Sequence, residues 1–220
     1  TQPMLRLVPE ARGGRPLRLL CIGAHSDDLE IGCGGTVLTW LTSMPAVEIT
    51  WVVLCAEKIR AAEARRSARA LLARATTRKV IIANFRDCFL QSQYVDVKSY
   101  FEDLKRGVNP DVVITHWLQD RHQDHRLAAE LTWNTWRNHL VLEYEIPKYE
   151  GDLATPNAYV PISASLARRK VSHLHRCFSS QRGKDWFAAD TFLGLMRLRG
   201  LESRSQSGFA EAFHARKLVL

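Results

Sequence analysis

Two clusters of histidine and aspartate stand out because each follows directly on an apolar run. The first, over residues 25–28, reads His-Ser-Asp-Asp and ends the run over residues 17–22. The second, over residues 116–125, follows the run over residues 111–115. Polar groups at the end of a buried strand are costly to bury without partners, and a divalent metal would satisfy them. We therefore expect one composite metal site built from both clusters.

The first cluster offers two ligands, and the second offers candidates for a third. A catalytic zinc ion usually has three protein ligands and one open position for water. His25 and Asp28 are three residues apart, so one tight turn can aim both at a single ion. The candidates for the third ligand are His116, His122 and His125.

Asp27 lies beside these ligands but need not bind the metal itself. It could accept a proton from metal-bound water, whose pKa the metal lowers. A histidine of the second cluster that is not a ligand could act as an acid or stabilise an oxyanion. The plain alternative is that Asp27 and Asp28 only cap the following helix. Two such clusters at one edge of a sheet are much less expected by chance, which favours the metal site.

The elements that must position these residues alternate along the chain. Strand-like and helix-like runs follow one another in a βαβα order, which predicts an α/β fold, a Rossmann-like and mainly parallel sheet flanked by helices. Ligands of such sheets bind beyond the carboxyl ends of the strands, where His25 and His116 fall. The expected strands are 17–23, 47–55, 79–83, 112–115 and 141–146, and the expected helices are 32–42, 57–75, 95–106 and 124–137, the last capped by Asp124.

The last third of the sequence is less regular. Residues 148–161 contain Gly and Pro and predict a long loop, which we expect to line the mouth of the site. We expect a helix over 163–179 capped by Ser163, another helix over 191–199 and a final strand over 213–220. Residues 1–16 predict a flexible N-terminal lead-in without the apolar segment of a signal peptide. Residues 17–220 then form a single domain.

Composition narrows the classes of protein. The chain has 220 residues, 46% hydrophobic and 25% charged, which is ordinary for a globular protein, and no apolar run approaches the length of a membrane helix. Its five scattered cysteines include no C-x-x-C pair, so a reducing cytoplasm fits best. The net charge of +8 indicates either a solvated basic surface or attraction to an anionic substrate. No nucleic-acid-binding module is recognisable.

The glycines that follow the first cluster have two interpretations. Residues 32–35 read Gly-Cys-Gly-Gly and suggest a dinucleotide-binding loop. In that fingerprint the glycines directly follow the strand. Here residues 25–28 occupy that turn, and their two carboxylates would repel a phosphate. Close packing of the helix on the sheet is therefore the better explanation.

The motifs together resemble one family. Residues 24–35 resemble the A-H-P-D-D motif of the PIG-L/LmbE-like zinc-dependent deacetylases, and residues 122–125 (His-Gln-Asp-His) resemble their second motif, H-P-D-H. Weaker similarities to other motifs of the family extend the resemblance to about residues 17–214. Ser26 and Gln123 replace prolines of the motifs, which alters the rigidity of the turns more than the chemistry. These weaker similarities lie at 85–87, 159–163, 179–181 and 209–213.

This resemblance implies a function and a role for each motif residue. The family removes acetyl groups from N-acetylated amino sugars, often N-acetylglucosamine linked to another group. By motif position, His25, Asp28 and His125 would hold Zn²⁺. Asp27 would be the general base. His122 would polarise the carbonyl or stabilise the intermediate, and Asp124 would orient a catalytic histidine.

The implied substrate is a small N-acetyl sugar or its conjugate. The alternatives are an amidase that acts on another amide conjugate and a non-catalytic member that binds a sugar. Four basic residues near the motifs or in predicted rim segments could meet an anionic group of the substrate, although solvated surface is the plainer interpretation. They are Arg121, Arg126, Lys148 and Arg182. The sequence identifies neither the sugar nor the oligomeric state.

Overall fold

A seven-stranded sheet forms the centre of the protein in the computed structural model, which describes residues 4–10 and 12–219. The strand order is β3-β2-β1-β4-β5-β7-β6. Strands β1 to β5 are parallel, and β7 runs antiparallel to both β5 and β6. The strands are β1 (Leu17–Gly23), β2 (Val47–Val53), β3 (Thr77–Ile82), β4 (Val112–His116), β5 (Leu140–Tyr144), β6 (Ala158–Ile162) and β7 (Phe209–Ala215).

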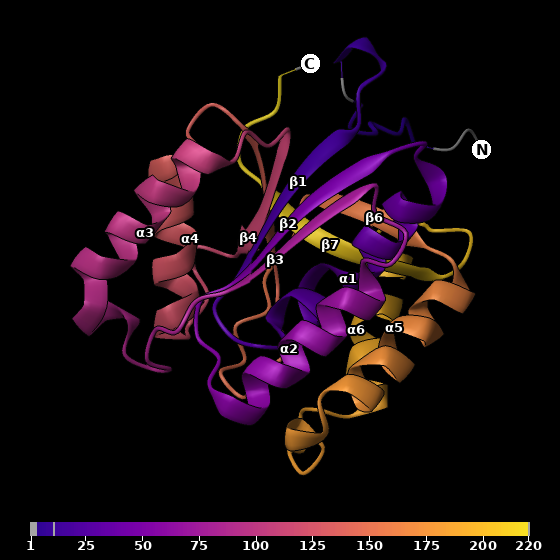
Figure 1. Cartoon of the computed structure of the whole chain (residues 1–220). Coiled ribbons are helices and arrows are strands. Elements are labelled where there is room, and N and C mark those ends of the chain that lie inside the picture. The colour runs from indigo at the N-terminus through magenta and orange to yellow at the C-terminus, as the bar shows by residue number, and fades with distance from the viewer. Residues whose placement is uncertain (1–3, 11, 220) are drawn as a thin grey trace.

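Helices cover both faces of this sheet (Figure 1). One face packs against α1, α2, α5 and α6, and the other packs against α3 and α4. The predicted α/β fold is therefore confirmed. The helices are α1 (Asp28–Ser43), α2 (Lys58–Leu71), α3 (Tyr94–Gly107), α4 (Gln123–Thr135), α5 (Ala164–Cys177) and α6 (Ala189–Glu202), with short 3-10 turns η1 (Arg12–Gly14), η2 (Leu90–Gln93) and η3 (Ser179–Gln181).

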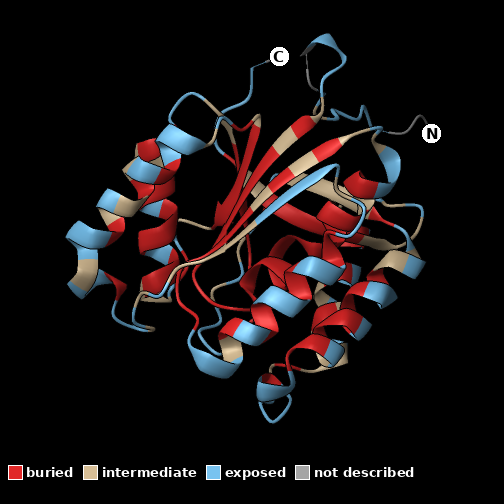
Figure 2. Cartoon of the chain, in the orientation of Figure 1, coloured by how far each residue is buried: buried red, intermediate tan, exposed pale blue. Residues whose placement is uncertain are grey.

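The core lies between the sheet and these two helical layers (Figure 2). Strands β1 and β4 are buried along almost their whole length, because helices cover them on both sides. This is why their sequences are nearly continuous apolar runs rather than alternating patterns. In the part of the chain that the structure describes, no helix combines the length and the apolar character needed to cross a bilayer.

Several predicted boundaries were wrong. Helix α1 begins at Asp28 rather than at residue 32, so the motif aspartate opens the helix, where a carboxylate is favoured by the helix dipole. The predicted loop over 148–161 ends in β6. Pro161 is tolerated there because β6 is an edge strand that pairs only with β7. The last strand is Phe209–Ala215, not 213–220.

Capping was predicted correctly for α5 but not for α4. The side chain of Ser163 accepts a hydrogen bond from Leu166 N, as expected. The N-cap of α4 is His122, whose Nδ1 accepts from Asp124 N at 3.3 Å. The Asp124 carboxylate instead accepts from the backbone of Cys88 and Leu90.

In the predicted lead-in, residues 1–3 and 11 lie outside the described part, and Arg15 donates to Asp111 at 2.7 Å.

The glycines of α1 bring the helix against the sheet, as their sequence context predicted. A Cβ atom on Gly32 would lie 2.1 Å from Cδ2 of Tyr144, and one on Gly35 would lie 2.4 Å from Cδ1 of Ile162. Tyr144 is fully buried and donates its hydroxyl to Ile22 O at 3.0 Å, so its ring has little freedom to move.

We expect Gly32→Ala to destabilise the protein by about 1–3 kcal/mol, because the new methyl group overpacks the Tyr144 ring. Gly34→Ala is the matched control in the same helix, since its Cβ would meet nothing closer than 3.9 Å. Alanine at that position should be neutral or slightly stabilising. Urea unfolding of both variants measures the difference, and equal midpoints would contradict the packing explanation.

Candidate metal centre and active site

The two motif clusters meet at the point where the strand order reverses. β1 lies between β2 and β4 in the sheet, and the chain winds from β1 toward β2 and β3 before crossing to β4. A crevice forms at such a switch point beyond the carboxyl ends of the strands. The turn after β1 carries His25, and β4 ends at His116. Helix α4 then supplies His125 in its first turn.

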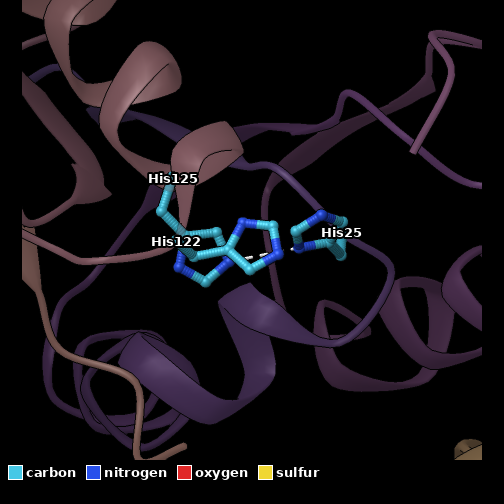
Figure 3. A group of neighbouring side chains, drawn as sticks. All are labelled: His25, His122 and His125. Atoms are coloured by element: carbon cyan, nitrogen blue, oxygen red, sulfur yellow. Dashed lines mark hydrogen bonds between the residues drawn. The ribbon is translucent and has the colours of Figure 1, made fainter. Parts of the chain in front are cut away.

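Three side-chain atoms form a small triangle beyond the carboxyl ends of β1 and β4. His25 Nδ1 lies 3.1 Å from His125 Nε2 (Figure 3) and 3.3 Å from Asp28 Oδ2. His125 Nε2 lies 3.5 Å from the same Asp28 oxygen. Ligand atoms at about 2.0–2.1 Å from a tetrahedral zinc ion are about 3.3–3.4 Å apart. The donor set and its spacing therefore fit one metal ion on these three atoms.

His116 is close to this triangle but its Nε2 is engaged elsewhere. That nitrogen lies 2.9 Å from Ala24 N and 3.1 Å from Asp28 Oδ2. Unprotonated Nε2 accepts from the Ala24 amide, and protonated Nε2 donates to the Asp28 carboxylate. The Nδ1 atom of His116 has no hydrogen-bond partner among the described residues, and Asp28, His116 and His125 also form a possible ligand set. Both contacts of Nε2 compete with metal binding there, so His116 is a weaker candidate than His125.

His122 lies beside the triangle with one nitrogen free. Its Nδ1 accepts from Asp124 N, so the neutral ring carries its proton on Nε2. Burial and the neighbouring His25 lower the pKa of His122, which keeps the ring neutral at pH 7. Its ring lies 4.8 Å from that of His25 and 4.6 Å from that of His125. His25, His122 and His125 also form a possible ligand set, in which His122 takes the place of Asp28.

Carboxylates surround His25. Asp87 Oδ1 and Asp124 Oδ2 lie 3.1 and 3.3 Å from its Nε2, and Asp28 faces its Nδ1. Burial opposes a charge on the ring, but Asp28, Asp124 and Asp87 outweigh it and raise the pKa of His25 well above its usual value. A pocket with this density of negative charge is electrostatically suited to a cation.

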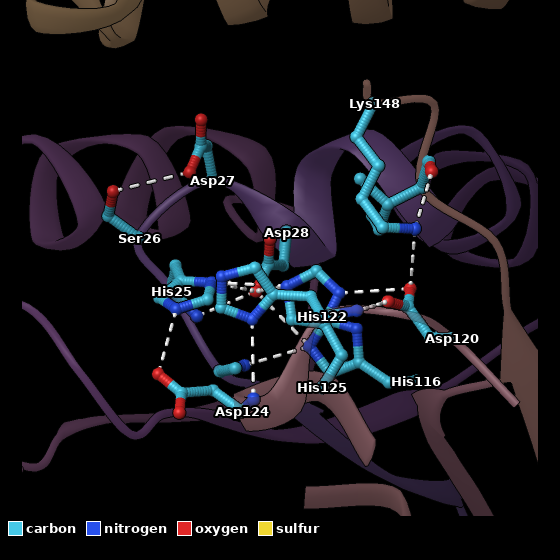
Figure 4. A network of polar contacts seen from close by, with 12 residues as sticks. His25, Ser26, Asp27, Asp28, His116, Asp120, His122, Asp124, His125 and Lys148 are labelled. Atoms are coloured by element: carbon cyan, nitrogen blue, oxygen red, sulfur yellow. Dashed lines mark hydrogen bonds and ion pairs between the residues drawn. The ribbon is translucent and has the colours of Figure 1, made fainter. Parts of the chain in front are cut away.

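Asp27 directly precedes the proposed ligand Asp28, is buried, and has one oxygen without a partner. Only 2% of the residue is exposed. Its Oδ1 accepts from Arg60 at 3.3 Å and from Ser26 at 3.4 Å, and the contact with Ser26 is drawn in Figure 4. Its Oδ2 has no hydrogen-bond partner among the described residues. Burial and the adjacent Asp28 raise the pKa of Asp27, against the opposing effects of Arg60 and His25. A buried carboxylate with a free oxygen and a raised pKa is suited to accept a proton.

Asp124 and Asp120 hold the histidines in place. Asp124 accepts from Cys88 N at 2.7 Å and from Leu90 N at 3.2 Å, and it faces His25 rather than the His122 ring. Asp120 Oδ2 lies 3.0 Å from His125 Nδ1, which leaves Nε2 of that ring directed into the triangle. Carboxylates that bind the second nitrogen of a histidine commonly fix the orientation of a metal ligand.

No pattern in the sequence indicated a role for Arg60, Asp87 and Asp120. Arg60 donates to Asp27, to Asp87 at 3.0 Å and to Ser26 at 3.0 Å, although it comes from α2. It looked like one more arginine of an exposed helix. Asp87 belongs to one of the weaker motif similarities, at residues 85–87, and Asp120 lies inside the second cluster. Each of the three is a charged residue close to a motif, which the sequence shows. Only the fold shows toward which groups its side chain points.

An open groove of about 780 Å³ adjoins the second cluster. Arg121 and Arg126 line it together with Trp117, and Asp152 to Ala154 of the segment after β5 form its other side. Part of the predicted loop therefore does border a groove beside the motif. The groove is large enough for a group attached to a sugar.

Comparison with known proteins places the chain in a family. Residues 20–136 match the model of the PIG-L family, described as GlcNAc-PI de-N-acetylase, and the chain belongs to this family. It is 31% identical over 141 residues to the Escherichia coli K12 protein called uncharacterized deacetylase YaiS, covering 59% of this chain and 74% of YaiS. The predicted family is thus confirmed.

Solved structures share the fold at lower identity. N,N'-diacetylchitobiose deacetylase from Pyrococcus horikoshii superposes with a TM-score of 0.65 at 23% identity, over 90% of this chain and 82% of that one. The 4-carboxy-2-hydroxymuconate hydratase GalB from Pseudomonas putida KT2440 superposes with a TM-score of 0.73 at 18% identity, over 93% of this chain and 98% of GalB. A deacetylase and a hydratase share this architecture, so the reaction must be argued from the site.

Proposed function

We propose that this protein is a zinc-dependent hydrolase that removes the acetyl group from an N-acetylated amino sugar of the N-acetylglucosamine type, or from its conjugate. The bond broken would be a linear amide C–N bond. The observation that carries the proposal is the triangle of His25, Asp28 and His125 beside the buried carboxylate of Asp27, in a chain of the PIG-L family.

Each residue of the site has a role in this proposal. His25, Asp28 and His125 would hold zinc, which when bound would lower the pKa of a water molecule and polarise the amide carbonyl. Asp27 takes a proton from the attacking water on its free Oδ2. His122 donates from Nε2 to the oxygen that gains negative charge. Asp124 positions His25 through their 3.3 Å contact. Asp27 then passes this proton to the leaving nitrogen, and the products are acetate and a free amine.

The two alternatives, an amidase and a non-catalytic sugar-binding member, differ in the role that they give to Asp27. An amidase acting on another conjugate would use the same residues, so only the substrate distinguishes it. A sugar-binding member without activity has no need of a buried carboxylate beside the ligands. The spare oxygen of Asp27 therefore favours an enzyme.

A substrate panel tests the proposal. The zinc-loaded protein is incubated with free and conjugated N-acetyl sugars and with other amides, and acetate and free amine are measured separately. We expect acetate and amine in equal amounts from at least one N-acetyl sugar. Amine without acetate, from another amide, would favour the amidase. Sugar binding without any product would favour the non-catalytic member.

We further propose that the groove beside Trp117 accepts an anionic group of the substrate. The guanidinium of Arg121 makes no ion pair with a carboxylate among the described residues, so it is free to bind a phosphate or a carboxylate. A cytoplasmic location also stays a prediction, supported by five cysteines that are all free in the structure.

We expect Arg121→Gln to raise KM for an anionic N-acetyl sugar conjugate by about tenfold, which corresponds to about 1.4 kcal/mol. KM for a neutral N-acetyl sugar should stay unchanged, because that substrate has no charge to pair. Arg69→Gln, an exposed residue of α2, is the control. Steady-state kinetics on both substrates measure the effect, and an equal rise for both would exclude an anionic subsite.

A further inference from the structure

The segment between β5 and β6 carries a buried ion pair that reaches the site. Lys148 Nζ donates to Asp152 Oδ2 at 2.6 Å and to Asp120 Oδ2 at 3.0 Å. Only 10% of the Lys148 side chain and 6% of the Asp152 side chain are exposed. Asp152 also accepts from Arg121 N at 2.7 Å, so the segment is fastened to the second cluster at two points.

The same oxygen of Asp120 binds both Lys148 and His125. Asp120 Oδ2 lies 3.0 Å from Lys148 Nζ and 3.0 Å from His125 Nδ1 (Figure 4). Asp120 Oδ1 accepts from His122 N at 2.8 Å. This carboxylate is therefore at once a partner of the proposed metal ligand, of the backbone before α4 and of a lysine from a distant segment.

A buried carboxylate needs such a partner to stay in place. Only 1% of Asp120 is exposed. Without Lys148, its carboxylate would keep two hydrogen-bond donors but no cation in contact among the described residues, which is costly for a buried charge. The carboxylate would then turn toward water, and this change would loosen the hydrogen bond that directs His125.

We propose that Lys148 is a positioning residue for the metal centre. It holds Asp120 so that His125 presents Nε2 to the ion, and it thereby links the segment between β5 and β6 to metal binding. This inference rests on the proposed zinc site. In this proposal, the Lys148–Asp152 pair does more than stabilise the segment. If it only stabilised the segment, its loss would affect the groove but leave zinc affinity unchanged.

Zinc affinity of the metal-free protein, measured by competition with a chromophoric chelator, tests this without any substrate. We expect Lys148→Met to weaken zinc binding by about tenfold and Asp120→Asn by about 10–100-fold, as for other residues that orient metal ligands. Lys148→Arg keeps the charge and the donor and should bind zinc nearly as the wild type does. Lys105→Met, an exposed residue of α3, is the control.

The double variant decides whether Lys148 acts through Asp120. In an Asp120→Asn background, Lys148→Met should weaken zinc binding no further, because the carboxylate that it holds is gone. Wild-type affinity in Lys148→Met, or fully additive losses in the double variant, would overturn the inference. If Lys148→Met does not fold, Lys148→Gln, which is polar but uncharged, carries the same test: a loss of zinc affinity there supports the inference, and wild-type affinity overturns it.

The outcomes also separate this inference from the proposed function. A wild-type protein that binds zinc but releases no acetate from any N-acetyl sugar contradicts the proposed function alone. A wild-type protein that binds no zinc overturns both.

Discussion

Asp27→Asn should lower kcat by about 10²–10⁴-fold while the protein still binds about one zinc ion per chain. The substitution preserves the shape of the side chain and removes its basicity. Asp27 Oδ1 would keep its contact with Arg60, so the fold around the site should stay intact. What is lost is the free oxygen that accepts the proton of water. KM should change little, because the amide occupies the same volume.

Steady-state kinetics and metal analysis on the same samples check this result. Asp103→Asn, at an exposed position of α3 where 66% of the side chain is accessible, controls for the loss of one negative charge. Loss of zinc from Asp27→Asn would make Asp27 a ligand and reverse the roles of the two adjacent aspartates. Full activity with zinc retained would place the base elsewhere and contradict the mechanism.

His125→Ala should weaken zinc binding by more than about 100-fold, because it removes one of the three proposed protein ligands rather than a residue that orients one. His125 is buried and its Nε2 lies within 3.1–3.5 Å of both other proposed ligand atoms. Activity should fall in proportion to the zinc lost and should recover in part when zinc is supplied in excess.

His122→Ala separates the two possible ligand sets. If the ligands are His25, Asp28 and His125, His122→Ala keeps its zinc and loses turnover, since only the donor to the oxyanion is gone. If they are His25, His122 and His125, both His122→Ala and His125→Ala lose zinc. Full zinc retention in His125→Ala would instead make His122 or His116 the third ligand, so metal analysis of the two variants gives a direct answer. His139→Ala, on the turn before β5, is the control for loss of a histidine.

The sequence by itself determined the family and the architecture. β1 has the predicted bounds, and the family, the α/β fold and the packing role of Gly32 were predicted from local patterns. These features are local: an apolar run shows that a strand is covered on both faces, and a polar cluster at its end shows where a site begins. Residue type and position along one element are enough for such conclusions.

Only the tertiary structure decided which side chains meet. His25 and His125 are separated by 100 positions and become neighbours because β4 pairs with β1. The arrival of Arg60 from α2 and of Lys148 from the segment after β5 has no periodic signal in the sequence. Whether a charged residue near a motif faces solvent or a ligand depends on strand order and on the direction of each side chain. These are set by long-range packing, which no local pattern of residues contains.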